Sequence, residues 1–381
     1  MSVTRTGTRP GSYGISGKLR SVDWMLLLIS LVLSSAGIAA VYVAGSEARQ
    51  YYATNQAIGF VVGLVGAVPL ALFDYRILKR HLRLLYAAAL AMLLVVTIAG
   101  EMAGGAQRWI DIGPVQVQPS EFAKLFMVIV LAGYFSDVYV GGYLNFLKGL
   151  GIVCLPALLV FMQPDLGTAL VFGAVFFTMS FIGGARIVQL GLLTASAVGA
   201  FVLAVKLKIL EEYQVARLTT FLDPNAASTD LGYQVAQSKT AIGSGGLTGK
   251  GMEEATTLSN LGYLPEDHTD FIFANLAERV GFVGCVVLLL LFLVLIWRIL
   301  HVATISRDRF GVLIAVGVAT IFLFHVFVNL GMAMGIMPVT GIPLPFISYG
   351  RSSLVVSIIA LGLLQSVAIH SRSEGAKQFS V

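Results

Sequence analysis

The sequence predicts an all-α polytopic membrane protein of about ten transmembrane helices, and three observations support this fold class. Of the 381 residues, 57% are hydrophobic and only 12% are charged, whereas soluble domains carry about 25% charged residues. Apolar runs recur at lengths near the ~20 residues that a helix needs to cross the hydrocarbon core. The Lys and Arg residues cluster between these runs, which is typical of membrane topology. We therefore expect no nucleic-acid partner, despite a net charge of +5.

Seven apolar runs precede one long polar connection, and three follow it. Each run is predicted to be a helix because every backbone amide must be satisfied within the segment in lipid. The fourth and fifth runs are short and contain charges, so nine spans is the alternative to ten. The expected spans are residues 24–45, 52–73, 84–100, 121–135, 149–163, 166–185, 187–205, 270–297, 310–336 and 352–370.

The distribution of basic residues predicts that both ends of the chain are cytoplasmic. In that orientation the inner segments carry most of the Lys and Arg, and the short outer loops carry only Arg49, Arg108 and Arg351. The long connection, about 206–268, then lies on the outer face between the seventh and eighth helices. Loops of this length are usually functional or disordered, so we expect the functional site on the outer face of the membrane. The predicted parts are a cytoplasmic tail (1–20), one membrane domain (21–370) and a second cytoplasmic tail (371–381).

Ionisable side chains at membrane depth are costly, and the few in this chain are candidate functional residues. Glu121 and Lys124 open the fourth run, and Asp165 lies between the fifth and sixth. Glu278 and Arg279 are adjacent in the eighth. The structural alternative is neutralisation in pairs, either Lys124 with Asp165 or Glu278 with Arg279.

The segment 264–273 brings three acidic residues and a histidine to the start of the eighth helix. Thr269 or Asp270 falls at an N-cap position, and capping alone would explain one carboxylate. Capping explains less well why three acidic residues and a histidine occur together. An ionised carboxylate at the outer mouth of a span can take a proton from a sugar hydroxyl. We therefore favour a general base at this position over a helix cap.

Three further segments carry polar or backbone-breaking residues. The stretch 237–251 is Gly-rich and basic, which loosely fits a phosphate cradle or a flexible loop, but it does not match the Walker A pattern. In the stretch 105–110, Arg108 beside Trp109 fits an interfacial anchor or a contact to pyrophosphate or sugar. The stretch 337–350 contains three prolines and two glycines, so it is predicted to be non-helical and to line protein or water.

Taken together, and in this order, these segments resemble the signature stretches of the SEDS family of bacterial membrane glycosyltransferases. The similarity covers residues from about 20 to 370, and six motifs in register are a specific signal. The motifs are G-x-Q-R-W ending at Trp109, Gln118–Lys124, Gln163–Ala169, Gly232–Gly246, Leu264–Phe273 and Gly341–Gly350.

The resemblance implies an inverting glycosyltransferase that polymerises lipid II on the outer face of the bacterial cytoplasmic membrane. It also implies a class B penicillin-binding protein as partner. The family's proposed catalytic base, the Asp of H-T-D-F, corresponds to Asp270. No metal ligands follow from the residues, and a divalent cation is left open as a cofactor. The substrate-binding or supporting residues that we expect are Arg108, Trp109, Glu121, Lys124, Asp165, Arg217, Lys239 and His268, with Lys250 as a further cation near the leaving pyrophosphate.

Two local features bear on placement within the family. The G-A-Q-R-W form and the F-L-D-P-N segment (221–225) favour the elongation member, RodA, over the division member, FtsW. Where the family usually has S-Y-G-G-S-S, this chain has Arg351 in place of the second glycine. This added cation suggests contact with a phosphate or a partner, or simple snorkelling.

Two other functions remain as alternatives. A lipid II flippase or another transporter would suit the polytopic architecture and the broken segment near the C-terminus. A transporter is expected to keep its decisive carboxylate near the midplane, whereas Asp270 is predicted at the outer boundary. A catalytically idle scaffold that recruits a penicillin-binding protein would need no carboxylate there.

Overall fold

The computed structural model describes residues 21–44, 49–103, 106–112, 115–208, 212–222, 230–252 and 256–378. The predicted tail at 1–20, Gly105 of the G-A-Q-R-W motif and residues 223–225 of the F-L-D-P-N segment lie outside these ranges. The described part is nearly all helical, and this confirms the predicted fold class.

Within the described residues, eight helices are long and apolar enough to cross a membrane, and two shorter apolar helices bring the number to ten. Each of these ten helices covers one of the predicted spans, so the sequence placed them correctly. The last one continues as far as Gln378. In chain order they are α2 (Trp24–Ala44), α3 (Arg49–Leu72), α5 (Leu82–Ala99), α6 (Pro119–Asp137), α7 (Tyr143–Met162), α8 (Leu166–Ile182), α9 (Ile187–Lys206), α12 (Ile272–Ile305), α13 (Arg309–Ala333) and α14 (Arg351–Gln378).

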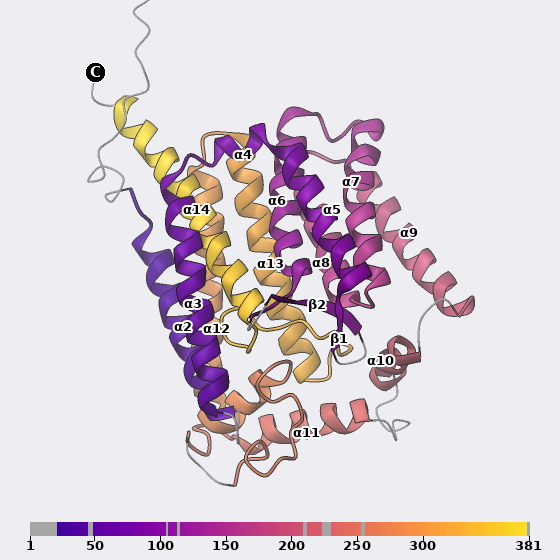
Figure 1. The fold of residues 1–381 in the computed structure, drawn as a ribbon, viewed down its shortest axis with the longest axis vertical. Helices are drawn as coiled ribbons and strands as arrows, with labels where there is room; N and C mark the ends of the chain where they lie inside the picture. Colours follow the sequence, from indigo (N-terminus) through magenta and orange to yellow (C-terminus); the bar gives the residue numbers. More distant parts are fainter. Residues whose placement is uncertain are drawn as a thin grey trace, which may run out of the picture.

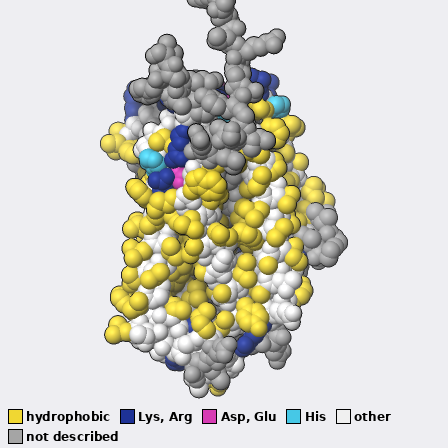
Figure 2. All heavy atoms as spheres, turned by 90° about the vertical axis from the view of Figure 1, so that its left-hand side faces the viewer, with side chains coloured by type: hydrophobic (Ala, Val, Ile, Leu, Met, Phe, Trp, Pro, Cys, Tyr) yellow, Lys and Arg dark blue, Asp and Glu magenta, His cyan; other side chains and the backbone are white. Residues whose placement is uncertain are grey.

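The helices differ in how deeply the rest of the protein buries them. Helices α6, α13 and α14 are 78%, 72% and 83% buried along their most apolar windows, whereas α9 is only 11% buried. In Figure 1, α6 and α13 lie inside the bundle and α9 stands at its edge. Apolar side chains cover the middle of the face in Figure 2, with Lys and Arg toward its two ends. Such a belt is what a lipid-facing surface requires.

Most of the polar connections meet at the end of the bundle opposite the C-terminal end of α14 (Figure 1). A small antiparallel sheet lies there, in the order β1 (Glu101–Ala103), β2 (Ala106–Ile112) and β3 (Val115–Val117). Where the structure describes the long connection between α9 and α12, it contains two helices, α10 (Glu212–Leu222) and α11 (Asp230–Ser244). Neither this sheet nor these helices were predicted from the sequence.

The Gly-rich stretch is neither a phosphate cradle nor a loose surface loop. Its first half belongs to α11, and its second half is hydrogen-bonded to α12: the Lys250 and Gly251 amides donate to the Glu278 and Arg279 carbonyls. A Cβ on Gly249 would lie 2.1 Å from the Arg279 carbonyl oxygen. Glycine is therefore needed here because two backbones approach closely.

At the other end of the bundle, two carboxylates, of which Asp23 is buried and Asp308 partly exposed, bind the termini of several helices. Asp23, just before α2, accepts hydrogen bonds from Arg298 of α12 and Arg372 of α14. Asp308 caps α13 by accepting from the Gly311 amide at 2.7 Å. The short helix α4 (Arg76–Arg80) lies at this end, between α3 and α5. These contacts fix the ends of helices that are far apart in sequence.

Candidate active site

Asp270 lies in the turn that leads into α12, at the end of the bundle that carries the sheet and the long connection. Helix α12 begins at Ile272, its N-cap residue is Phe271, and no side chain caps it. The alternative interpretation of Asp270 as a helix cap is therefore wrong. Its side chain is partly buried, and within the described part of the chain its carboxylate accepts no hydrogen bond. A carboxylate in this position is available for chemistry.

The surroundings of Asp270 bring its pKa close to neutrality. Burial raises the pKa of Asp270 to about 6, and the charge of Glu266 acts in the same direction. The positive charges of Arg217, Arg108 and His268 oppose this rise. Asp270 precedes the membrane-spanning helix α12, which begins at Ile272. A pKa near the working pH is what a general base needs.

Arg217 of α10 and Asp270 converge on Gly341. A Cβ built on Gly341 would lie 3.7 Å from Asp270 Oδ2 and 3.9 Å from each terminal nitrogen of the Arg217 guanidinium. Arg217 also lines a small pocket together with Lys239 of α11 and Pro338. One predicted cation, Arg217, therefore lies beside the predicted base, and a second, Lys239, shares a pocket with Arg217.

Arg108, also predicted, belongs to strand β2 and interacts with the connection between α7 and α8. Its guanidinium donates to the Gln163 carbonyl at 3.2 Å and to the Pro164 carbonyl. Trp109 follows it on the same strand and is partly buried. The strand thus brings Arg108 within electrostatic reach of Asp270, while much of its hydrogen-bonding capacity is used by carbonyls.

The stretch 337–350, which we call the extended segment, is non-helical as its prolines predict, and it holds the turn that carries Asp270. The Tyr349 amide donates to the His268 carbonyl at 2.8 Å, and Ser348 Oγ donates to the Thr269 carbonyl at 2.7 Å. From α3, Gln56 Nε2 donates to the Ser348 carbonyl at 3.0 Å. The backbone around Asp270 is therefore fixed by hydrogen bonds to its neighbours.

His268 belongs to an aromatic cluster that the sequence analysis missed. Its ring stacks on Tyr52 of α3 with centroids 4.5 Å apart, and Tyr349 meets Tyr52 edge-on at 4.9 Å. His268 Nδ1 also lies 3.2 Å from the carboxylate of Asp267. A tyrosine at the end of an apolar run gives no sign of such a contact, because interfacial tyrosines are common in membrane helices.

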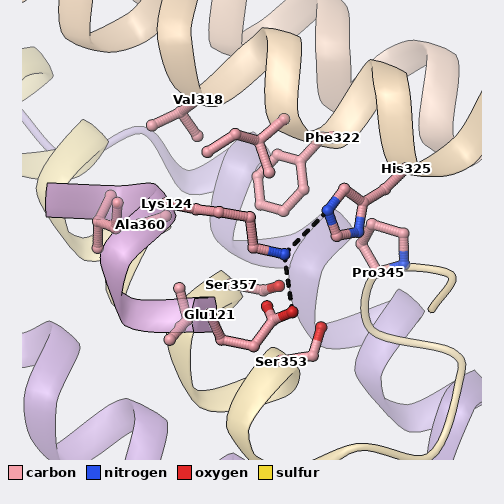
Figure 3. A pocket seen from close by; sticks show the side chains of 12 residues that line it. Glu121, Lys124, Val318, Phe322, His325, Pro345, Ser353, Ser357 and Ala360 are labelled. Atoms are coloured by element: carbon pink, nitrogen blue, oxygen red, sulfur yellow. Dashed lines mark hydrogen bonds and ion pairs between the residues drawn. The ribbon is translucent and has the colours of Figure 1, made fainter. Parts of the chain in front are cut away.

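Glu121 and Lys124 lie in the middle of the helix bundle, away from solvent. Figure 3 shows the Lys124 ammonium between Glu121 and His325, with Ser353 and Ser357 nearby. Lys124 Nζ is 2.7 Å from Glu121 Oε1 and 3.1 Å from His325 Nε2. The cavity beside them is about 20 Å³, room for about one water molecule. These residues can support the fold around the site, but no substrate fits against them here.

Both pairings proposed for the buried charges are wrong. Lys124 pairs with Glu121 of its own helix, while Asp165 caps α8 through the backbone and side chain of Thr168, at 3.1 and 2.9 Å.

Glu278 and Arg279 also have separate partners. Glu278 pairs with Lys250 at 2.6 Å, and Arg279 donates to Asn275 and to backbone carbonyls. Adjacent residues on a helix point in different directions, which is why such neighbours rarely pair.

These observations define a polytopic membrane protein with a carboxylate of raised pKa and an adjacent guanidinium at one end of its bundle. The family model FTSW_RODA_SPOVE, described as "Cell cycle protein", matches residues 19–373. The chain therefore belongs to this family, and the resemblance to SEDS proteins is confirmed.

Curated relatives from several organisms match nearly the whole chain. Stage V sporulation protein E of Bacillus subtilis (strain 168) is 36% identical over 370 residues, covering 93% of this chain and 99% of that protein. Peptidoglycan glycosyltransferase MrdB of Escherichia coli (strain K12) is 37% identical over 350 residues, covering 91% and 93%. The probable peptidoglycan glycosyltransferase FtsW of Trichlorobacter lovleyi is 35% identical over 367 residues, covering 92% and 94%. Because these identities are so similar, they do not separate the branches of the family.

Solved structures share the fold. A chain from a peptidoglycan synthase complex that coordinates polymerization and crosslinking superposes with a TM-score of 0.78 at 30% identity, covering 92% of this chain and 98% of that one. The crystal structure of the rod shape determining protein RodA of Thermus thermophilus superposes with a TM-score of 0.69 at 30% identity, covering 91% and 96%.

Proposed function

We propose that this protein is a peptidoglycan glycosyltransferase that polymerises lipid II in the bacterial cytoplasmic membrane. Two relatives over nearly the full length carry the name peptidoglycan glycosyltransferase. The observation that carries the proposal is the position of Asp270, which is partly buried, outside the α12 helix and beside Arg217. Burial raises the pKa of Asp270 to about 6, so at neutral pH most of the carboxylate is ionised and can accept a proton.

In the proposed reaction, Asp270 takes the proton of the 4-hydroxyl of the acceptor sugar. The hydroxyl oxygen attacks the anomeric carbon of the lipid-linked donor chain, and the new glycosidic bond forms with inversion. The bond from that carbon to the pyrophosphate oxygen breaks, and its electron pair leaves with undecaprenyl pyrophosphate. Atoms and charge balance, because one proton moves to the carboxylate and the new negative charge resides on the leaving group.

The leaving pyrophosphate needs nearby cations. Of the five basic residues expected to serve it, Lys124 is buried in an ion pair with Glu121, and Lys250 is paired with Glu278. Arg217, whose guanidinium lies beside Asp270, and Lys239 line one pocket, and Lys239 has no ion pair within the described residues. We assign the pyrophosphate to Arg217 and Lys239, with Arg108 contributing charge from a greater distance.

We infer that the site faces the outer side of the membrane, because the basic residues of the other loops favour the inner side. A class B penicillin-binding protein is the proposed partner, in line with the related chain from a synthase complex. The G-A-Q-R-W and F-L-D-P-N sequences favour a role in cell elongation. Mg²⁺ often binds substrate phosphates with only one or two protein carboxylates. A requirement for a divalent cation is therefore tested by assaying polymerisation with and without a chelator.

The test is polymerisation of labelled lipid II by the purified protein with its partner, resolved on a gel. We expect glycan polymer from the wild type and none from Asp270→Asn, with both proteins equally folded by thermal unfolding in detergent. Full activity of the Asn variant would refute the base assignment. Movement of lipid II across vesicle membranes without polymer would instead favour the flippase.

A further inference from the structure

Helix α13 carries two polar residues one turn apart, His325 and Asn329, inside a largely apolar span. Their side chains are 2% and 0% exposed, and the residue spacing places them on one face of the helix. Buried polar groups of this kind cost free energy unless they are hydrogen-bonded. The proposed chemistry assigns no task to either residue.

His325 and Asn329 bind main-chain carbonyls of the extended segment and of Asp270. Asn329 Nδ2 donates to the Ile342 carbonyl at 2.8 Å and to the Asp270 carbonyl at 3.1 Å. His325 Nδ1 lies 3.1 Å from the Pro343 carbonyl oxygen. Helix α13 thus binds two successive carbonyls of the extended segment. The side-chain amide of Asn329 also links that segment to the main chain of Asp270.

These contacts fix the proton positions on both side chains. A carbonyl only accepts, so Nδ1 of His325 carries the proton, and Nε2 accepts from the Lys124 ammonium 3.1 Å away. Asn329 uses both N–H groups on carbonyls, while its Oδ1 is buried without a partner in the described part of the chain. Leaving an acceptor unsatisfied is costly, so the two donated bonds dictate how this side chain is oriented.

The extended segment explains why donors are needed here. Its backbone is not helical, and its prolines lack amides, so several buried carbonyls have no partner in regular secondary structure. Ile342 is 3% exposed and Pro343 is partly buried, so water has little access to replace those partners. A segment without its own ladder of hydrogen bonds stays in place only where side chains hold it.

We propose that His325 and Asn329 are positioning residues that hold the extended segment and the Asp270 backbone in the geometry the reaction needs. This inference rests on the proposed glycosyltransferase function. Neither residue touches substrate; both act through main-chain carbonyls. A misplacement of about 1 Å at a reacting group can cost about 100-fold in rate, so loss of these bonds lowers kcat while substrate affinity stays near its original value.

Four variants separate positioning from general stability. Asn329→Leu removes both donors at similar size. His325→Asn keeps a donor near the place of Nδ1, because the Asn amide branches at the same atom, whereas His325→Gln reaches toward Nε2 and loses the carbonyl. Thr320→Val is the matched control: Thr320 is also buried on α13, but its hydroxyl donates to Val316 of its own helix.

Each full-length variant is assayed with its partner for kcat and KM on lipid II, and by hydrogen exchange of peptides covering 264–271 and 337–350. We expect at least a tenfold loss of kcat for Asn329→Leu and His325→Gln, with KM within about twofold and faster exchange in both peptides. His325→Asn and Thr320→Val stay close to the wild type. If Asn329→Leu does not fold, the comparison of His325→Asn with His325→Gln tests the positioning role.

Wild-type kcat and exchange in both Asn329→Leu and His325→Gln would overturn the inference, as would equal losses in His325→Asn and His325→Gln. An absence of polymer from the wild type would refute the proposed function instead, and the exchange data would still report whether α13 holds the segment.

Discussion

Replacing Arg217 by Gln tests the electrostatics of the site most directly. The Asp270 carboxylate and the Arg217 guanidinium both lie within 4 Å of one point at Gly341, so they are at most about 8 Å apart. With an effective dielectric constant of about 20, a charge pair at that distance interacts by about 2 kcal/mol, and less where solvent intervenes. Since about 1.4 kcal/mol corresponds to one pKa unit, loss of the cation raises the pKa of Asp270 above its wild-type value of about 6.

The measurement is kcat/KM for lipid II polymerisation between pH 5 and 9. The base acts when ionised, so activity falls as the pH drops below the pKa of Asp270, and the wild-type midpoint is expected near pH 6. Arg217→Gln moves that midpoint up by about one pH unit. Arg217→Lys keeps the charge and serves as the control. Glu266→Gln moves the midpoint down, because the charge of Glu266 raises the pKa of Asp270.

The position of the midpoint is the diagnostic quantity, because Arg217→Gln also lowers the maximal rate if Arg217 binds pyrophosphate. An unchanged midpoint in Arg217→Gln would refute the electrostatic reasoning. A wild-type profile that is flat down to pH 5 would show that Asp270 does not act as a base with this pKa.

Two further predictions concern stability. Gly249→Ala is expected to prevent correct folding, since its φ of +79° and the 2.1 Å approach to Arg279 leave no room for a methyl group; recovery of monodisperse protein with wild-type thermal stability would contradict this. Burial alone would raise the pKa of Asp23. The hydrogen bond from Arg298 and the nearby positive charges together lower it by more than burial raises it, so the pKa of Asp23 is below its usual value. Its stabilisation is therefore present above the unfolded pKa near 4 and lost as the pH falls through the lower folded pKa. Asp23→Asn should cost about 1–3 kcal/mol at neutral pH, measured by thermal unfolding, and should melt with a weaker dependence on acid pH than the wild type; equal acid sensitivity would count against the assignment.

The sequence predicted the helices well because membrane insertion imposes a simple rule. A span must be apolar and about 20 residues long, so α2 and α14 can be located without knowledge of their neighbours. The three closely spaced prolines of the extended segment likewise oppose a continuous helix, whereas single prolines are accommodated in α3 (Pro69) and α7 (Pro156). The small sheet and the helices α10 and α11 lie in polar connections, where no such rule applies.

Interactions between side chains were harder to predict than the spans. Pairing of Lys124 with Asp165 was one alternative, but Lys124 pairs with Glu121 of its own helix and hydrogen-bonds to His325, because partner choice depends on which faces pack together. The contacts of Asn329 were missed altogether. An asparagine in an apolar run shows that some partner exists, but the sequence does not reveal that two carbonyls distant in the chain are those partners. The proximity of Arg217 to Asp270 could not be predicted for the same reason: the two residues are distant in the chain and meet only in the folded protein.

The junction of the Gly-rich stretch with α12 has a mechanical consequence. The amides of Lys250, Gly251, Phe282 and Val283 form four main-chain hydrogen bonds across it. Such bonds do not depend on side-chain identity, so neighbouring positions can change while the coupling persists. A displacement of the connection that precedes α12 is therefore transmitted to α12 through the main chain, at the point where Gly281 interrupts the helix.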